Sequence, residues 1–234
     1  MNFVWQNLRK RGQNKAAIRS LERLVSSPSA DLVLLQETFA RRILEIDRLA
    51  HTVPIYVSRD LSAFVGPAIG NVAVFCDEPF VLGLTLNALT VLNVHLSAYQ
   101  GAKRSQQLEC MLRLLDKSIN NNIVIGGDFN LAPYDRDGLF NGAFSSWTLD
   151  SERRVLRELM KRHGLFDVLG ESPPQEFTIE RHLRGGLVQF RCDFILCSEA
   201  LRSSAQASYI HEARTGSWAF TDHSGMRLSL ETRK

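Results

Sequence analysis

The sequence has few cysteines, little net charge and no long hydrophobic run, and each absence narrows the class of protein. Its four cysteines lack metal-ligand spacing such as Cys-x-x-Cys, so we expect reduced thiols in a core and a reducing compartment. No apolar run reaches the roughly 18–20 residues of a membrane span, and the first residues lack the apolar segment of a signal peptide. These absences predict a cytoplasmic protein without a membrane span.

The net charge of +3 is too small to indicate nucleic-acid binding by itself. Arginine predominates among the basic residues, however, since 22 of the 28 are Arg and 6 are Lys. Arg suits bidentate contacts with phosphate, although compositional bias explains the skew equally well. The 234 residues fit one large domain or two small ones. Since no linker, repeat or low-complexity tract interrupts the chain, we expect a single domain over 1–234, with no obligate protein partner evident.

Helices alternate with strands early in the chain, whereas strands dominate later. Apolar residues at helical spacing predict helices over 13–26, 39–50, 103–119 and 151–163. Apolar runs predict strands over 2–7, 31–37, 53–58, 71–76, 80–86, 89–96, 123–130, 176–179, 187–197, 205–211 and 226–230. A long connection over 131–149 and basic loops over 8–12 and 181–186 separate some of them. About ten strands are too many for one small sheet. We therefore predict an α/β (α+β) fold, a four-layer α/β-sandwich of two packed mixed β-sheets flanked by helices.

The run 123–130 ends in residues that suit a binding or catalytic site. Its apolar strand stops at Gly126 and Gly127, which lets a backbone or ligand approach closely. Asp128 and Asn130 follow two residues apart, so alternation turns both side chains to the same side. An ordinary turn explains these residues as well as a functional site does, because Asp and Asn favour turns.

Other strands also end in polar side chains, which are costly beside apolar runs unless they are paired or used. The residues are Asn7, Glu37, His95, Asp128, Asn130, Asp193, Asp222 and His223. Carboxylates suit Mg²⁺, and a His backed by a carboxylate suits acid–base catalysis. No Ser or Cys lies in a nucleophile elbow. Together these residues indicate hydrolysis of a phosphate ester by activated water.

Six short motifs in order resemble those of the endonuclease/exonuclease/phosphatase superfamily, which includes exonuclease III-like and deoxyribonuclease I-like enzymes. They are Asn7, Leu35-Gln36-Glu37-Thr38, Asn93-Val94-His95-Leu96, Gly126-Gly127-Asp128-Phe129-Asn130, Arg191-Cys192-Asp193-Phe194-Ile195-Leu196 and Thr221-Asp222-His223-Ser224. Each motif is weak alone, but their order and spacing span residues 7 to 224.

The resemblance implies roles for the metal and the water. Glu37 resembles the main metal ligand, and Asn7 and Asp222 resemble its ligand or outer-shell partners. Asp128 resembles the residue that positions or deprotonates the attacking water, and Asn130 resembles the residue that orients it. The implied cofactor is Mg²⁺, with Mn²⁺ able to use the same ligands.

The resemblance also implies the acid–base groups. His223 resembles the catalytic imidazole and Asp193 its partner, while His95 occupies the place where the family binds the scissile phosphate. The chain departs from the family at three positions. His95 replaces the Tyr of exonuclease III-like members, Ile179 replaces a Trp, and Arg9 stands where some relatives have a second carboxylate. These departures weaken an assignment to abasic-site repair.

Three basic residues are candidates for contacting the substrate phosphate. Arg104 begins a helix where some relatives contact phosphate, although a solvated helix face is an equal alternative. Arg9 and His182 lie in the two basic loops.

We therefore expect a Mg²⁺-dependent phosphodiesterase that acts on nucleic acid, with DNA favoured. A phosphoesterase of the same fold that acts on a lipid head group, inositol phosphate or other small ester remains the alternative. A catalytically inactive binding module is disfavoured because all eight polar residues are present.

Overall fold

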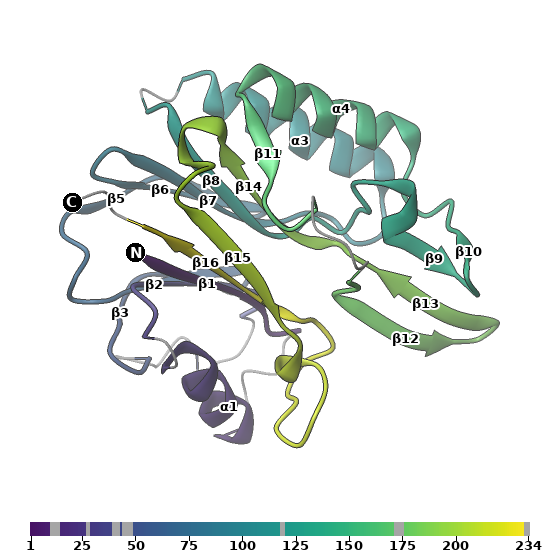
Figure 1. Cartoon of the computed structure of the whole chain (residues 1–234), viewed down its shortest axis with the longest axis horizontal. Helices are drawn as coiled ribbons and strands as arrows, with labels where there is room; N and C mark the ends of the chain where they lie inside the picture. Colours follow the sequence, from purple (N-terminus) through teal and green to yellow (C-terminus); the bar gives the residue numbers. More distant parts are fainter. Residues whose placement is uncertain are drawn as a thin grey trace.

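The structure is a computed structural model that describes residues 1–9, 15–26, 29–38, 43, 49–117, 120–170 and 176–231. Across these residues the strands form three sheets, two of six strands and one of four (Figure 1). The longer helices are α1 (Lys15–Ser26), α3 (Gly101–Leu115) and α4 (Asp150–Arg162), and the short 3₁₀ helices are η1 (Asp135–Asp137), η2 (Glu199–Leu201) and η3 (His211–Ala213).

The first large sheet contains β1 (Asn2–Asn7), β2 (Leu32–Gln36), β3 (Val53–Val57), β4 (Leu61–Val65), β15 (Ala205–Ile210) and β16 (Gly225–Leu230). Their order is β15-β16-β1-β2-β4-β3. The central pair β1–β2 is parallel, and every other neighbouring pair is antiparallel. At the far end of β1 from Asn7, Met1 and Leu230 exchange two backbone hydrogen bonds of 2.7 and 2.8 Å.

The second large sheet contains β5 (Val72–Glu78), β6 (Val81–Leu86), β7 (Leu89–His95), β8 (Asn122–Asp128), β11 (Leu165–Asp167) and β14 (Asp193–Ser198). Their order is β11-β14-β8-β7-β6-β5. Again the central pair, β7–β8, is parallel and the others are antiparallel. Both large sheets are therefore mixed, as predicted.

The two large sheets pack face to face, and helices cover their outer faces (Figure 1). Alternation along single strands divides the core. Trp5 faces the space between the sheets while its neighbour Val4 packs in the cluster with α1. On β8, Val124 faces the same intersheet space while Ile125 packs in the cluster with α3 and α4. This arrangement confirms the predicted four-layer α/β-sandwich.

The glycine pair at the end of β8 meets two different packing demands. A Cβ on Gly126 would lie 2.6 Å from Cε2 of Trp5, so the intersheet core accepts only a hydrogen there. Gly127 has φ +138°, and a Cβ on it would lie 2.1 Å from the carbonyl oxygen of Val94 on β7. The glycines thus let β8 approach both its neighbouring strand and the facing sheet, which delivers Asp128 directly to the edge of the sandwich.

A small third sheet corrects the sequence prediction. It contains β9 (Gly138–Phe140), β10 (Ala143–Phe144), β12 (Ile179–Leu183) and β13 (Gly186–Phe190), in the order β10-β9-β13-β12. Residues predicted as the connection 131–149 supply two of these strands. The predicted basic loop 181–186 is mostly the end of β12 and its tight turn into β13.

Other boundaries also differ. The predicted strand 187–197 is interrupted at Arg191 and Cys192, which separate β13 from β14, and β4 and β11 were not predicted. Most of the predicted helix 39–50 and of the basic loop 8–12 lies outside the described residues. Among the described residues, no helix has the length and apolar character needed to cross a membrane.

Candidate active site

The carboxyl ends of both parallel strand pairs meet at one edge of the sandwich. β1 and β2 pair up to Asn7 and Gln36, and β7 and β8 pair up to His95 and Asp128. β14 runs in the opposite direction, so its first residue, Asp193, also lies opposite Asp128. Polar residues far apart in sequence therefore converge because of strand direction and register alone.

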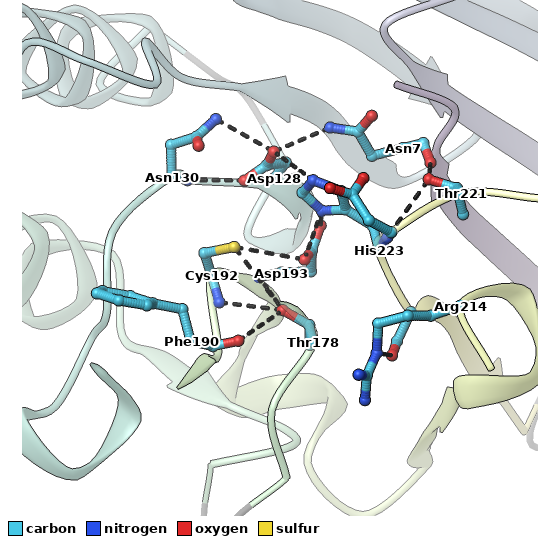
Figure 2. Close-up of polar contacts among 12 residues, drawn as sticks. Asn7, Asp128, Asn130, Thr178, Phe190, Cys192, Asp193, Arg214, Thr221 and His223 are labelled. Atoms are coloured by element: carbon cyan, nitrogen blue, oxygen red, sulfur yellow. Dashed lines mark hydrogen bonds and ion pairs between the residues drawn. The ribbon is translucent and has the colours of Figure 1, made fainter. Parts of the chain in front are cut away.

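His223 lies between two carboxylates (Figure 2). Its Nδ1 is 3.0 and 3.1 Å from the two carboxylate oxygens of Asp193, and its Nε2 is 3.8 Å from Oδ2 of Asp128. Burial disfavours the charged ring, but Asp193 and then Asp128 outweigh it and raise the pKa of His223 to about 10. His223 is therefore an imidazolium at neutral pH, with one ring nitrogen fixed by Asp193.

Asp128 is the most connected group of the cluster. Its carboxylate accepts hydrogen bonds from the side-chain amides of Asn7 (2.9 Å) and Asn130 (3.1 Å) and from the backbone N–H of Asn130 (2.8 Å) (Figure 2). Only 1% of the residue is exposed. Burial raises the pKa of Asp128 to about 6, and Asp193 adds to the shift while His223 and His95 oppose it. A carboxylate with this pKa and a fixed orientation suits the acceptance of a proton from water.

Backbone strain accompanies the cluster. Arg9, Glu37 and Asn130 have φ of 45°, 48° and 50°, in the left-handed region that non-glycine residues rarely adopt. Asn tolerates this conformation because its short polar side chain can hydrogen-bond the nearby backbone, whereas the longer side chains of Arg and Glu do not offer this. Such strain is typical of functional sites, where the surrounding structure holds residues in an unfavourable conformation.

Glu37 faces the cluster from the end of β2. Its Oε1 lies 3.6 Å from Nε2 of His95 and accepts a 3.3 Å hydrogen bond from Nδ2 of Asn7. Glu37, His95 and Asp128 each offer one ligand atom within 4.8 Å of the others. The oxygen of the Asn7 side chain instead accepts a 2.8 Å hydrogen bond from the backbone of Arg9. In this arrangement Asn7 bridges two carboxylates and does not turn its oxygen toward them.

Two arginines contact only one of the two carboxylate oxygens of Asp222. Its Oδ2 is 2.5 Å from Nη1 of Arg9 and 3.7 Å from Nη1 of Arg181. Its Oδ1 is buried and has no hydrogen-bond partner among the described residues. Asp222 lines the same groove as Glu37 and Asp128, and an unsatisfied carboxylate oxygen suits a hard divalent cation such as Mg²⁺, which binds carboxylate oxygens and water.

Six of the eight strand-end residues, all except Asn7 and Asp193, line a groove of about 770 Å³. Its wall contains Arg9, Glu37, His95, Tyr99, Lys103, Asp128, Asn130, Arg181, Asp222 and His223. A smaller cavity of about 260 Å³ adjoins it and shares Tyr99, Asn130 and Arg181. Its remaining lining is mainly apolar and includes Phe140, Trp147, Val188, Phe190 and Cys192. The site thus combines a charged groove with an adjoining apolar cavity.

Two of the candidate phosphate contacts lie elsewhere. Arg104 is 2% exposed, forms an ion pair with buried Glu152 and donates to the carbonyl oxygens of Ser97 and Ala98. Its guanidinium is therefore a structural link between α3 and α4, and we remove it from the candidate site. His182 is exposed and does not line the groove, because alternation along β12 places its neighbour Arg181 there instead.

Three groups at the site were missed from the sequence: Lys103, Arg181 and Cys192. Alternation from Ile179 could have favoured Arg181 over His182, had the start of β12 been known. Arg191, two residues before Asp193, forms ion pairs with Asp137 (2.8 Å) and Asp167 (2.7 Å).

Comparison with known proteins agrees with this geometry. The model of the Endonuclease/Exonuclease/phosphatase family matches residues 4–223, so the chain belongs to that family. No curated relative matches in sequence. An AP endonuclease from Archaeoglobus fulgidus has a similar structure, with a TM-score of 0.78 and 16% identity over 99% of this chain and 100% of that one. The 3′ phosphatase NExo from Neisseria, bound to a product DNA hairpin, has a TM-score of 0.74 and 18% identity over 99% and 100%.

The endonuclease domain of TRAS1, a telomere-specific non-LTR retrotransposon, has a TM-score of 0.71 and 16% identity over 100% of this chain and 99% of that one. At such low sequence identities, the TM-scores show a shared fold alone. The family match confirms the resemblance drawn from the six motifs.

Proposed function

We propose that the chain is a Mg²⁺-dependent phosphodiesterase that hydrolyses nucleic acid, with DNA the favoured substrate. The observation that carries this proposal is the His223–Asp193 pair beside Asp128, with Glu37 facing the same groove. An imidazolium, a buried carboxylate and a carboxylate able to hold a cation are the groups that phosphodiester hydrolysis needs.

Each of these residues has a separate role in the proposed reaction. Asn130 keeps Asp128 oriented, and Asp128 accepts a proton from the water that attacks phosphorus. Asp193 holds the Nδ1 proton of His223, so that Nε2–H donates a hydrogen bond to a non-bridging oxygen as charge gathers there. The P–O ester bond breaks as the new P–O bond to water forms, and the leaving alkoxide takes a proton from solvent. A divalent cation held by Glu37 and Asp222 would neutralise charge on the phosphate oxygens.

A nucleic-acid substrate is supported by the groove and its neighbouring cavity. Arg9, Lys103 and Arg181 bring positive charge to the groove wall, which suits successive phosphates. Beside it, Tyr99 is 82% exposed and contacts Trp147 edge to face, with ring centroids 6.2 Å apart. Exposed aromatic rings next to a phosphate site suit stacking against bases. The Neisseria protein of the same fold binds a DNA hairpin, which is consistent with such a substrate.

A substrate panel tests the proposal. Supercoiled plasmid, single-stranded DNA, RNA, phospholipid and a small phosphodiester are incubated with the wild-type protein, either with Mg²⁺ or with chelator. We expect Mg²⁺-dependent cleavage of DNA and loss of at least about 10²-fold in kcat for Asp128→Asn and His223→Ala. Asp150→Asn is the matched control, because that carboxylate is fully exposed on α4.

Cleavage that survives the chelator, or full activity in both site variants, would refute the mechanism. Activity confined to phospholipid or the small diester would instead favour the second candidate, a small-ester phosphoesterase. That candidate is supported by the apolar cavity of about 260 Å³ beside the groove, which can hold the non-phosphate part of a small ester.

A further inference from the structure

Cys192 has no part in the proposed hydrolysis, yet its thiol lies inside the catalytic cluster. Its Sγ is 3.5 Å from Oδ2 of Asp193 and 3.8 Å from the hydroxyl of Thr178. Figure 2 shows the sulfur directed toward the Asp193 carboxylate. Only 3% of the residue is exposed, and burial raises the pKa of the thiol. A neutral, buried thiol is a poor nucleophile, so its position calls for another explanation.

The atoms around Cys192 have the spacing of a metal site. Asp128, Cys192, Asp193 and His223 each offer one ligand atom, and these four atoms lie within 4.8 Å of one another. Tetrahedral zinc sites place neighbouring ligand atoms about 3.4–3.6 Å apart, given the usual Zn–S, Zn–N and Zn–O bond lengths. The Cys192–Asp193 distance is 3.5 Å, and Nδ1 of His223 is 3.0 Å from the same carboxylate oxygen. Because no two of the four ligand atoms are more than 4.8 Å apart, side-chain movements of about 1 Å would complete a tetrahedron.

The donor types separate this group from the magnesium ligands. Glu37 and Asp222 provide oxygen alone, which favours hard cations. Thiolate and imidazole favour Zn²⁺ and similar borderline or soft cations. The buried group lies between the two pockets, because Cys192 lines the apolar cavity while Asp128 and His223 line the groove.

We propose that Asp128, Cys192, Asp193 and His223 form a binding site for Zn²⁺ whose occupancy stops hydrolysis. The cation replaces the thiol proton of Cys192 and the ring proton at the coordinating nitrogen of His223, and both protons go to solvent. Asp128 then no longer accepts a proton from water. The binding rests on the geometry of the four side chains, whereas the inhibition rests on the proposed function.

Cobalt spectroscopy tests the binding without any enzyme assay. Co²⁺ added to the wild-type protein should give intense tetrahedral visible bands and a near-ultraviolet thiolate-to-cobalt band, and equimolar Zn²⁺ should abolish both. Cys192→Ser should lose the thiolate band. Cys110→Ser, which removes a more accessible thiol on α3, should keep it. No thiolate band in the wild type, or an equal band in Cys192→Ser, would overturn the site.

A measurement in the Cys110→Ser background avoids dependence on a Cys192 variant that fails to fold. X-ray absorption of its zinc complex should show one sulfur neighbour at about 2.3 Å and nitrogen or oxygen neighbours at about 2.0–2.2 Å. Neighbours of nitrogen and oxygen alone would exclude Cys192 as a ligand and overturn the proposal.

Inhibition is measured separately, with Mg²⁺ in excess. Zn²⁺ should inhibit the wild type reversibly, and Cys192→Ser should need at least about tenfold more Zn²⁺ relative to its own uninhibited rate. Equal sensitivity of the two proteins would overturn the inhibitory role. A wild-type protein that cleaves no phosphodiester would refute the proposed function, while the cobalt and absorption results would still decide the metal site.

Discussion

The Asp193→Asn variant should lose stability in a strongly pH-dependent way. His223 has a pKa of about 10 in the fold, against an ordinary value of 6.5. At roughly 1.4 kcal/mol per pKa unit, this shift corresponds to about 5 kcal/mol in favour of the buried imidazolium. Because the folded pKa is raised, this stabilisation is complete below pH 6.5 and is lost as the pH rises to about 10.

Asp193 is the foremost of the three carboxylates that raise the pKa of His223, and its oxygens are 3.0 and 3.1 Å from Nδ1 of His223. Asparagine keeps the shape but removes the charge, so burial of the ring then dominates and lowers the pKa. Removing one partner of a buried pair costs about 3–5 kcal/mol. We expect this loss in the free energy of unfolding at pH 6. Near pH 10 we expect little loss, because about half of His223 is then neutral in the wild type and nearly all of the pH-dependent stabilisation has gone.

Urea unfolding of the wild type and the variant at pH 6, 8 and 10 measures the difference directly, and NMR titration of His223 gives its pKa. Asp150→Asn, whose side chain is fully exposed and pairs with Arg153 at the start of α4, should cost less than about 1 kcal/mol at every pH. An equal loss for Asp193→Asn at pH 6 and pH 10, or a wild-type His223 that titrates near 6.5, would refute the electrostatic account.

Three further substitutions test the packing and the polar contacts that hold the site in place, and each is measured by urea unfolding. Gly126→Ala should cost about 1–3 kcal/mol, because its Cβ would lie 2.6 Å from the Trp5 ring. Glu152→Gln should cost about 3–5 kcal/mol by leaving the Arg104 guanidinium buried without a counter-charge, and Arg104→Met combined with Glu152→Leu should cost less than the single change. Tyr209→Phe should cost about 1–2 kcal/mol, because its hydroxyl donates to the carbonyl oxygen of Asp193 at 3.1 Å.

Each of these has a contrary outcome. Full stability of Gly126→Ala would mean that Trp5 moves aside without loss of packing. A double variant less stable than Glu152→Gln would mean that the intact ion pair stabilises the fold. The loss in Glu152→Gln would then not come mainly from the unpaired charge of Arg104. If Tyr209→Phe changed neither stability nor the titration of His223, the hydroxyl would have no role in holding Asp193.

The layers and the convergence of polar residues could be predicted from the sequence because both follow from alternation. A buried parallel strand has an apolar run, and the polar residue after it must lie at the sheet edge, as His95 and Asp128 do. The eight strand-end residues gather at one edge of the sandwich for this reason, and six of them line the groove. Their chemical roles remain predictions.

The small sheet could not be predicted, because β9 and β10 have three and two residues and little hydrophobic pattern. The position of β9 is set by long-range pairing with β13, between residues 48 to 52 positions apart, and β10 pairs with β9. The burial of Arg104 likewise depends on Glu152, 48 residues away, which a helix-terminal arginine does not reveal. The choice of Arg181 over His182 required the exact strand register.

The pairing of Met1 with Leu230 has a practical consequence. The two backbones meet at the opposite ends of β1 and β16 from Asn7 and His223, so a protein fused near either residue would leave the groove open. The turn between β6 and β7, at residues 87 and 88, lies on that same remote side because β7 ends at His95. Joining Met1 to Leu230 by a linker and opening the chain at this turn would give a circular permutant. Its new termini would lie far from every residue of the cluster, which makes the scaffold suitable for insertion into a host protein.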